Sequence, residues 1–183
     1  ASDDDAVVIE RHFAARDASE EVYFARDGAV QPPSRDVPPG GCNNPDEIAA
    51  MRRLQPDAVL VFGTGLLKLP LIDSFPGRIL NIHLGLSPYY RGAGTNFWPL
   101  VNREPEYVGA TIHYIDAGID TGPIIAHARP DLLPTDGPHD IGNREHRRIA
   151  ALALERRAEA VVAEFGAPRL LSVLDPGARA GVA

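Results

Sequence analysis

Two short runs of consecutive apolar residues predict buried strands. The first is Ala58–Phe62, and the second is Arg78–His83, where Asn81 interrupts the apolar residues. A strand that is apolar on both faces is typical of a parallel sheet covered by helices on both sides. We therefore expect these two strands to lie inside such a sheet.

Three further segments have the composition of strands. Thr111–Ile115 alternates and is rich in β-branched residues, and Pro123–Ala128 follows it after a turn. Val7–Ile9 is a shorter strand-like run near the start of the chain. These residue types favour the extended backbone, so all three segments are predicted strands.

Helical patterns lie between the predicted strands. A helix is expected from Asn44 to Leu54, because an amide N-cap and a proline precede apolar residues at helical spacing and Pro56 ends the run. Leu66–Phe75 predicts a short helix, and the stretch from Asp140 to Phe165 has the longest helical pattern. The last helix should pack on one face of the sheet.

This alternation of strands and helices predicts an α/β fold, with ligands at the carboxyl ends of the strands. A chain of 183 residues fits one domain, residues 1–183. The acidic residues 1–5 are expected to fray, and proline and glycine make residues 25–45 a predicted loop or linker.

The charge of the chain changes which partners are expected. A formal net charge of -7 gives no general attraction to nucleic acid or to an anionic membrane. The basic residues Arg144, Arg147 and Arg148 are expected to form one solvated helix face. We therefore expect no nucleic-acid partner.

The single cysteine and the absence of long apolar runs indicate where in the cell the protein is expected. Cys42 has no second cysteine to pair with, which favours a reducing cytoplasm. No export signal opens the sequence and no apolar run reaches the roughly 18 residues of a spanning helix. The expected location is cytoplasmic, without a membrane segment.

An amide and an imidazole lie two residues apart at the end of the second predicted strand. Asn81 and His83 therefore share one face of that strand. In acyl transfer an amide can hydrogen-bond a developing oxyanion while an imidazole handles a proton. The same spacing also fits an asparagine that ends a strand beside a surface histidine.

A turn-rich segment between two predicted strands holds two carboxylates, Asp116 and Asp120. Asp120 could reach His83 and orient its imidazole. For Asp116 we expect bonds to turn amides instead.

The loop Leu86–Trp98 follows the predicted strand end and mixes aromatic, basic and flexible residues, as binding loops do. Phe97 and Trp98 fit equally well as core anchors of a following helix. His113 could line a binding site or be a hydrogen-bonded strand histidine. No zinc-type ligand spacing is present, so no metal site is expected.

Together these segments resemble the folate-dependent formyltransferase family, which includes glycinamide ribonucleotide, methionyl-tRNA and sugar-nucleotide formyltransferases. The resemblance is carried by Asn81-Ile82-His83, by the loop with Leu86, Pro88 and Arg91-Gly92, and by Asp116-x-Gly118-x-Asp120-x-Gly122. It covers roughly residues 57–143.

The resemblance implies a Rossmann-like fold whose sheet is mostly parallel and flanked by helices. It implies transfer of a formyl group from 10-formyltetrahydrofolate to an amine of a small-molecule acceptor, such as an amino sugar. Asn81 would hold the formyl oxygen, His83 would assist removal of the amine proton, and Asp120 would orient His83. No metal would take part.

The resemblance also implies binding residues. The folate would lie near residues 133–137 and against two segments, which contain Phe62, Gly63, Thr64, Gly65, Leu66, Leu67, Asp116 and Gly118. The expected acceptor-binding residues are Tyr89, Tyr90, Arg91, Gly92 and His113.

The chain departs from the family pattern in two places. No first strand with a glycine-rich loop is evident before Asp57, so we expect a fold without the usual first βαβ unit. A second copy could cover the sheet edge left open, which makes a homo-oligomer a further hypothesis. The run His83-Leu84-Gly85-Leu86-Ser87-Pro88 also differs from the usual His-Pro-Ser-Leu-Leu-Pro.

Two other functions remain open at this point. The same three residues could serve a formyltetrahydrofolate hydrolase that uses water as the acceptor. A non-catalytic domain that binds folate or a protein is the third hypothesis.

Overall fold

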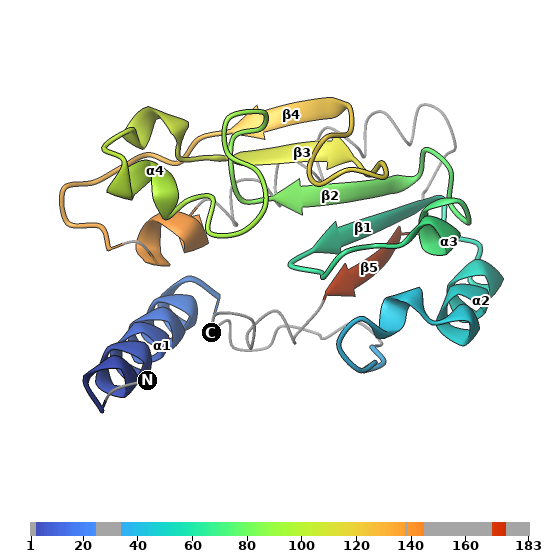
Figure 1. Ribbon diagram of the computed structural model, residues 1–183, viewed down its shortest axis with the longest axis horizontal. Helices are drawn as coiled ribbons and strands as arrows, with labels where there is room; N and C mark the ends of the chain where they lie inside the picture. The colour runs from blue at the N-terminus through green and yellow to red at the C-terminus, as the bar shows by residue number, and fades with distance from the viewer. Residues whose placement is uncertain (1–2, 25–33, 138, 145–169, 175–183) are drawn as a thin grey trace.

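The computed structural model describes residues 3–24, 34–137, 139–144 and 170–174 (Figure 1). Its centre is a five-stranded sheet in the order β4-β3-β2-β1-β5. The strands are β1 (Ala58–Phe62), β2 (Ile79–His83), β3 (Ala110–Tyr114), β4 (Ile124–Ala128) and β5 (Leu170–Leu174).

The directions of the strands confirm a mostly parallel sheet. Strand β1 pairs in parallel with β2 and β5, whereas β3 pairs antiparallel with both β2 and β4. Four strands therefore point the same way and β3 alone is reversed. The α/β class and the mostly parallel sheet are as the sequence predicts.

The four strands predicted between residues 58 and 128 are confirmed within one residue or so at each end, and β5 was not predicted. The prediction of a strand at Val7–Ile9 is wrong, since these residues lie in helix α1 (Asp3–Phe24). Three β-branched residues are too few to prevent a helix when alanine, glutamate and arginine follow them for several turns. Residues 3–5 belong to the same helix, and residues 1–2 of the segment expected to fray lie outside the described residues.

The alternation of side chains along β1 explains why its whole length is apolar. Val59 and Val61 pack into a cluster with Ile48, Leu71 and other side chains, on the side of the sheet where α2 and α3 lie. Ala58 packs into a second cluster with residues of β2, β3 and β4. A strand between two cores needs apolar residues at every position.

Helix α2 (Pro45–Arg53) begins and ends where its sequence predicts. The Asn44 side chain accepts a hydrogen bond from the backbone N–H of Asp46 at 3.0 Å, and Pro45 occupies the first turn. Arg52 and Arg53 lie in the last turn, where positive charge is favourable. Before it, residues 34–44 form a loop with one 3-10 turn, η1 (Gly41–Asn43), and residues 25–33 of the predicted loop lie outside the described residues.

Helix α3 (Leu69–Ile72) is shorter than the predicted Leu66–Phe75. The Asn43 side chain donates to the Leu66 carbonyl at 3.0 Å and accepts from the Lys68 N–H at 2.7 Å. These two bonds hold residues 66–68 outside the helix, so that the single turn starts next to Pro70. Two short helices, α4 (Trp98–Val101) and η2 (Pro105–Tyr107), complete the described elements between β2 and β3.

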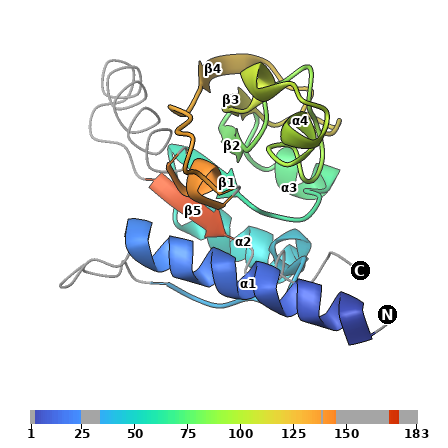
Figure 2. The same cartoon turned by 90° about the vertical axis from the view of Figure 1, so that its left-hand side faces the viewer.

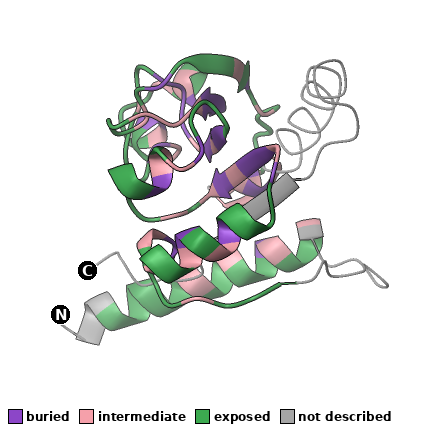
Figure 3. Cartoon of the chain, turned by 90° about the vertical axis from the view of Figure 1, so that its right-hand side faces the viewer, coloured by how far each residue is buried: buried purple, intermediate pink, exposed green. Residues whose placement is uncertain are grey.

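Helix α1 lies apart from the sheet and is mostly exposed, as Figures 2 and 3 show. Polar bonds connect it to residues 139–144, the helical start of the predicted helix from Asp140 to Phe165, most of which lies outside the described residues. The Ser19 hydroxyl donates to Asp140 Oδ1 at 2.7 Å, and the Arg144 guanidinium donates to the Tyr23 hydroxyl at 3.1 Å. In the part of the chain that the structure describes, no helix is both long and apolar enough to cross a membrane.

We predict that Leu80→Ala destabilises the fold by about 3 kcal/mol, because it empties a buried site in the second cluster. The Leu80 side chain is 1% exposed, and Leu54 at the end of α2 is 59% exposed. Urea unfolding measures the change, and Leu54→Ala is the matched control, expected within about 0.5 kcal/mol of the wild type. Equal losses in the two variants would contradict this assignment of the core.

Candidate active site

Three polar side chains meet on one face of the sheet. Asn81 and His83 lie two residues apart on β2, and the antiparallel register places His113 of β3 directly opposite Asn81. Opposed residues of an antiparallel pair project to the same face. The reversed direction of β3 therefore brings His113 next to the pair that the sequence predicts.

The Asp120 carboxylate joins these side chains. It comes from the loop between β3 and β4, and Asn81 Nδ2 donates to its Oδ1 at 3.1 Å. His83 Nδ1 lies 3.4 Å from Oδ2, and His113 Nε2 lies 3.4 Å from Oδ1. The structure thus brings together the three residues predicted to form the catalytic group, with His113 as a fourth member.

The backbone around Asp120 is shaped to bring the carboxylate over the sheet. Asp120 has a φ of +51°, in the left-handed region that aspartate tolerates better than most residues. Gly122 packs against β3 so closely that a Cβ there would lie 1.8 Å from the Tyr114 carbonyl oxygen. A larger residue at 122 would push the loop away from the strand that carries His113.

The loop after β2 closes on the same group from the other side. Figure 1 shows this loop passing in front of β2 and β3. The Gly92 N–H donates to Asp120 Oδ2 at 2.8 Å, and His83 Nε2 lies 2.9 Å from the Tyr90 carbonyl oxygen. A Cβ at Gly85 would lie 2.6 Å from His83 Nε2, so only glycine fits where the loop leaves the strand.

Both ring nitrogens of His83 face oxygens that can accept a hydrogen bond. Nδ1 lies 3.4 Å from a carboxylate oxygen of Asp120, and Nε2 lies 2.9 Å from the Tyr90 carbonyl oxygen. Neither oxygen can donate, so a hydrogen bond at either contact uses a hydrogen on the ring.

The charges of the group shift two pKa values in opposite directions. Burial would raise the pKa of Asp120, but its bonds to His113 and Gly92 and the nearby imidazoles outweigh burial and lower it. Burial would lower the pKa of His113, but its bonds to Asp120 and to the Tyr114 carbonyl outweigh burial and raise it. Each group favours the charged form of the other.

His113 does not line a surface for the acceptor. Its side chain is 1% exposed, and its Nδ1 faces the Tyr114 carbonyl oxygen at 2.8 Å. The prediction that His113 binds the acceptor is therefore wrong, because the ring is covered. It is instead the hydrogen-bonded strand histidine of the alternative hypothesis.

Asp116 bonds within its own turn, as expected. Its Oδ1 accepts from the Gly118 N–H at 2.9 Å and from the Thr121 hydroxyl at 2.6 Å. The bond from Thr121 is the main reason that the pKa of Asp116 is lowered. This turn holds the start of the segment that carries Asp120.

The segment from Phe62 to Leu67 begins with the last residue of β1 and is irregular after it. Gly63 has a φ of +58°, and Leu66 is 70% exposed. On the loop after β2, the Tyr89 ring packs 4.7 Å from the Tyr107 ring. Arg91 is exposed and has no hydrogen-bond or ion-pair partner within the described residues.

Sequence reasoning missed two residues at the edge of this site. Asn102 donates to the Tyr90 hydroxyl at 2.9 Å, and that hydroxyl donates to Glu104 Oε2. Both residues lie after α4, more than ten positions along the chain. No short motif links them to Tyr90, so only the folded chain shows the contact.

We predict that Asp120→Asn costs more stability near pH 5 than near pH 9. The stabilisation from Asp120 exists above its ordinary pKa of 3.8 and is lost as the pH falls through its lowered value. The stabilisation from His113 is complete below its ordinary pKa of 6.5 and is lost as the pH rises through its raised value. Both are therefore present near pH 5, and the His113 part is absent near pH 9.

Urea unfolding of the wild type and the variant at both pH values measures this difference. Asp136→Asn is the matched control, because Asp136 pairs with Arg144, whose charge does not change in this range. An Asp120→Asn cost that does not depend on pH would contradict the pairing with His113.

Solved structures that are similar to this chain support the fold. Phosphoribosylglycinamide formyltransferase from Bacillus halodurans is 31% identical, with a TM-score of 0.53 over 65% of this chain and 65% of that one. PseJ from Anoxybacillus kamchatkensis is 26% identical, with a TM-score of 0.51 over 64% of each chain. The latter was crystallised with tetrahydrofolate and UDP-4,6-dideoxy-4-formamido-L-AltNAc.

Curated relatives agree with the structures. Methionyl-tRNA formyltransferase from Trichlorobacter lovleyi is 33% identical over 122 residues, which are 66% of this chain and 37% of that protein. The Geobacter sulfurreducens enzyme of the same name is 36% identical over 112 residues, 61% of this chain and 34% of that protein. The chain thus spans little more than a third of these relatives. The family model described as formyl transferase matches residues 3–155, and the chain belongs to the formyl transferase family.

Proposed function

We propose that this chain transfers a formyl group from 10-formyltetrahydrofolate to the amine of a small-molecule acceptor. The observation that carries the proposal is the position of the Asp120 carboxylate, within 3.4 Å of His83 and bonded to Asn81. An amide donor, an imidazole and a carboxylate in contact are the groups that acyl transfer to an amine needs.

Each of the three residues has a distinct part in this reaction. Asn81 donates to the formyl oxygen, on which negative charge develops when the amine attacks. His83 takes the proton that the amine loses, and Asp120 stabilises the protonated ring. The bond from the formyl carbon to N10 of the folate then breaks, and N10 takes up a proton as tetrahydrofolate leaves. The Asn81 amide also donates to Asp120 Oδ1 at 3.1 Å, which holds this donor beside the carboxylate.

The proposed folate site is the irregular segment from Phe62 to Leu67 together with Asp116 and Gly118. No atom of the described residues lies within 4 Å of a Cβ built at Gly63, which supports a backbone open to a flat ring there. Exposed apolar side chains flank both segments, with Leu66 70% exposed and Ile119 53% exposed. A pteridine ring that packs on them would cover apolar surface that now faces water.

The proposed acceptor site is the loop after β2, with Tyr89, Tyr90, Arg91 and Gly92. Within the described residues the Arg91 guanidinium has no ion-pair partner, and the next residue, Gly92, donates to Asp120. An acceptor with an anionic group would find its counter-charge there. The net charge of -7 argues against a nucleic-acid acceptor.

Turnover of the purified protein tests this function. The protein is mixed with 10-formyltetrahydrofolate, with and without a panel of amino sugars and other amines, and tetrahydrofolate release is followed. Release that depends on an amine supports the transferase. Release without an amine would indicate the hydrolase, and folate binding without release would indicate a non-catalytic domain.

We predict that His83→Ala and Asp120→Ala each lower kcat about a thousandfold or more, because each removes part of the proton-accepting pair. Asn81→Ala should lower kcat by about a hundredfold and change folate binding little, since the formyl oxygen carries charge only in the transition state. Steady-state kinetics and folate titration measure the two effects, and circular dichroism checks the fold. Unchanged turnover removes a residue from the mechanism.

We also predict that Arg91→Ala raises KM for the acceptor about tenfold while KM for the folate stays within about twofold. Arg53→Ala on α2 removes the same charge from an exposed helix position and is the control, expected to leave both constants unchanged. An equal rise of the two constants would show that Arg91 does not belong to the acceptor site alone.

A further inference from the structure

Tyr90, in the loop after β2, makes contacts through both its backbone carbonyl and its side-chain hydroxyl. Its carbonyl oxygen lies 2.9 Å from His83 Nε2, and its hydroxyl donates to Glu104 and accepts from Asn102 at 2.9 Å. The side chain of Tyr90 therefore connects the reacting histidine to a part of the chain that touches neither Asn81 nor Asp120.

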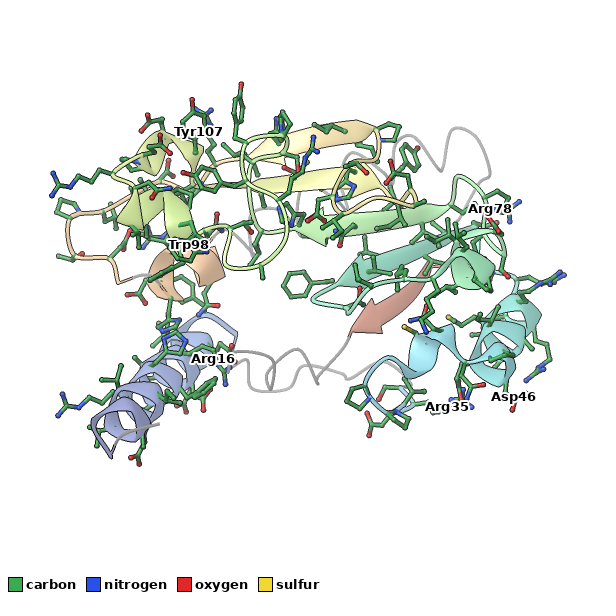
Figure 4. All side chains as sticks on the ribbon, viewed as in Figure 1. Arg16, Arg35, Asp46, Arg78, Trp98 and Tyr107 are labelled. Atoms are coloured by element: carbon green, nitrogen blue, oxygen red, sulfur yellow. The ribbon has the colours of Figure 1, made fainter. Side chains whose placement is uncertain are left out.

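The anchor for the Tyr90 hydroxyl is a fixed turn. The Asn102 N–H donates to the Trp98 carbonyl and the Glu104 N–H to the Pro99 carbonyl, each at 2.8 Å. Pro99 is buried, and the Tyr107 N–H in turn donates to the Glu104 carbonyl at 3.0 Å. Figure 4 shows Trp98 and Tyr107 at this same end of the molecule. The backbone that carries the Glu104 side chain is therefore held by hydrogen bonds on both sides of Arg103.

The Tyr90 hydroxyl keeps its proton near neutral pH, so it remains a hydrogen-bond donor. Its bond to Glu104 is the main cause that raises the pKa of Tyr90. Other charged groups near His83 are Asp120, which faces Nδ1, and His113, whose ring centre lies 6.3 Å from that of His83. Neither of them touches Nε2, which faces the Tyr90 carbonyl oxygen.

The direction of the His83 ring depends on both of its nitrogens. With Nε2 directed at the Tyr90 carbonyl oxygen, Nδ1 is directed at Asp120. If the loop were not held, the Tyr90 carbonyl could move, and the His83 ring could then rotate about its Cβ–Cγ bond. A carbonyl fixed through the Tyr90 side chain keeps the ring in one orientation.

We propose that Tyr90 is a positioning residue for His83 and that the bond of its hydroxyl to Glu104 gives it this role. This assignment rests on the proposed formyl transfer, in which His83 accepts the amine proton. Glu104 acts at a distance, through a hydroxyl, a ring and a backbone carbonyl. The catalytic step then depends on Glu104, a residue that the sequence did not indicate as a candidate.

The first test does not depend on turnover. In ¹⁵N-labelled protein, the His83 Nε2–H proton is identified by its absence in His83→Gln, and its exchange with water is measured. We expect slow exchange in the wild type and at least about tenfold faster exchange in Tyr90→Phe and Glu104→Ala. Glu104→Gln, whose amide oxygen can accept the same bond, should exchange as slowly as the wild type.

The matched control is Glu106→Ala. Glu106 is an exposed glutamate in η2, two positions after Glu104, and its replacement should leave the exchange of the His83 Nε2 proton unchanged. Exchange that stays slow in Glu104→Ala, or that is equally fast in Glu104→Gln, would overturn the proposal. The measurement requires no acceptor, so it decides the role of Tyr90 even where the wild type shows no formyl transfer.

The second test uses turnover. A positioning role predicts that Glu104→Ala lowers kcat about tenfold and changes KM for either substrate less than about twofold, with recovery in Glu104→Gln. If the contact with Glu104 served only to hold the loop for substrate binding, Glu104→Ala would instead raise KM. A rise in KM at constant kcat would overturn the positioning role.

Discussion

The carboxylate of Asp120 holds the site together. It accepts bonds from Asn81 and from the Gly92 backbone, and it lies 3.4 Å from each of two imidazoles. With its side chain 11% exposed, this charge needs nearby donors to offset the loss of water. The positions of β2, β3 and the loop after β2 are therefore coupled through a single group.

The reversed strand β3 makes this coupling geometrically possible. Because β3 runs antiparallel to β2, it places His113 opposite Asn81, and it ends beside the beginning of β2. The following segment must then fold back over the sheet to reach His83. The left-handed backbone of Asp120 and the close packing of Gly122 belong to that return. The site consequently lies on the face of the sheet and not only at the carboxyl ends of the strands.

A second set of contacts covers this site. The Tyr90 carbonyl oxygen lies 2.9 Å from His83 Nε2 and the Gly92 N–H donates to Asp120, so the loop after β2 lies over both side chains. The same loop carries Arg91, the residue proposed to contact the acceptor. The turn at Glu104 bonds the Tyr90 side chain of this loop.

The sequence by itself determined the parts of this protein whose signals are local. Consecutive apolar residues predicted β1 and β2, the N-cap and proline predicted the start of α2, and the two-residue spacing placed Asn81 and His83 on one face. A strand or a helix end depends on neighbours in the chain, so a single sequence contains the information. The motif around Asp120 was readable for the same reason.

Only the tertiary structure decided the contacts between segments distant along the chain. The position of His113 opposite Asn81 follows from the register of β2 and β3, and the short α3 follows from bonds made by Asn43. The contact of Glu104 with Tyr90 follows from a turn that brings the two residues together. Such pairings depend on how elements pack, and local spacing does not encode them. For that reason the residues proposed to react could be predicted from the sequence, whereas the groups that contact them from distant segments could not.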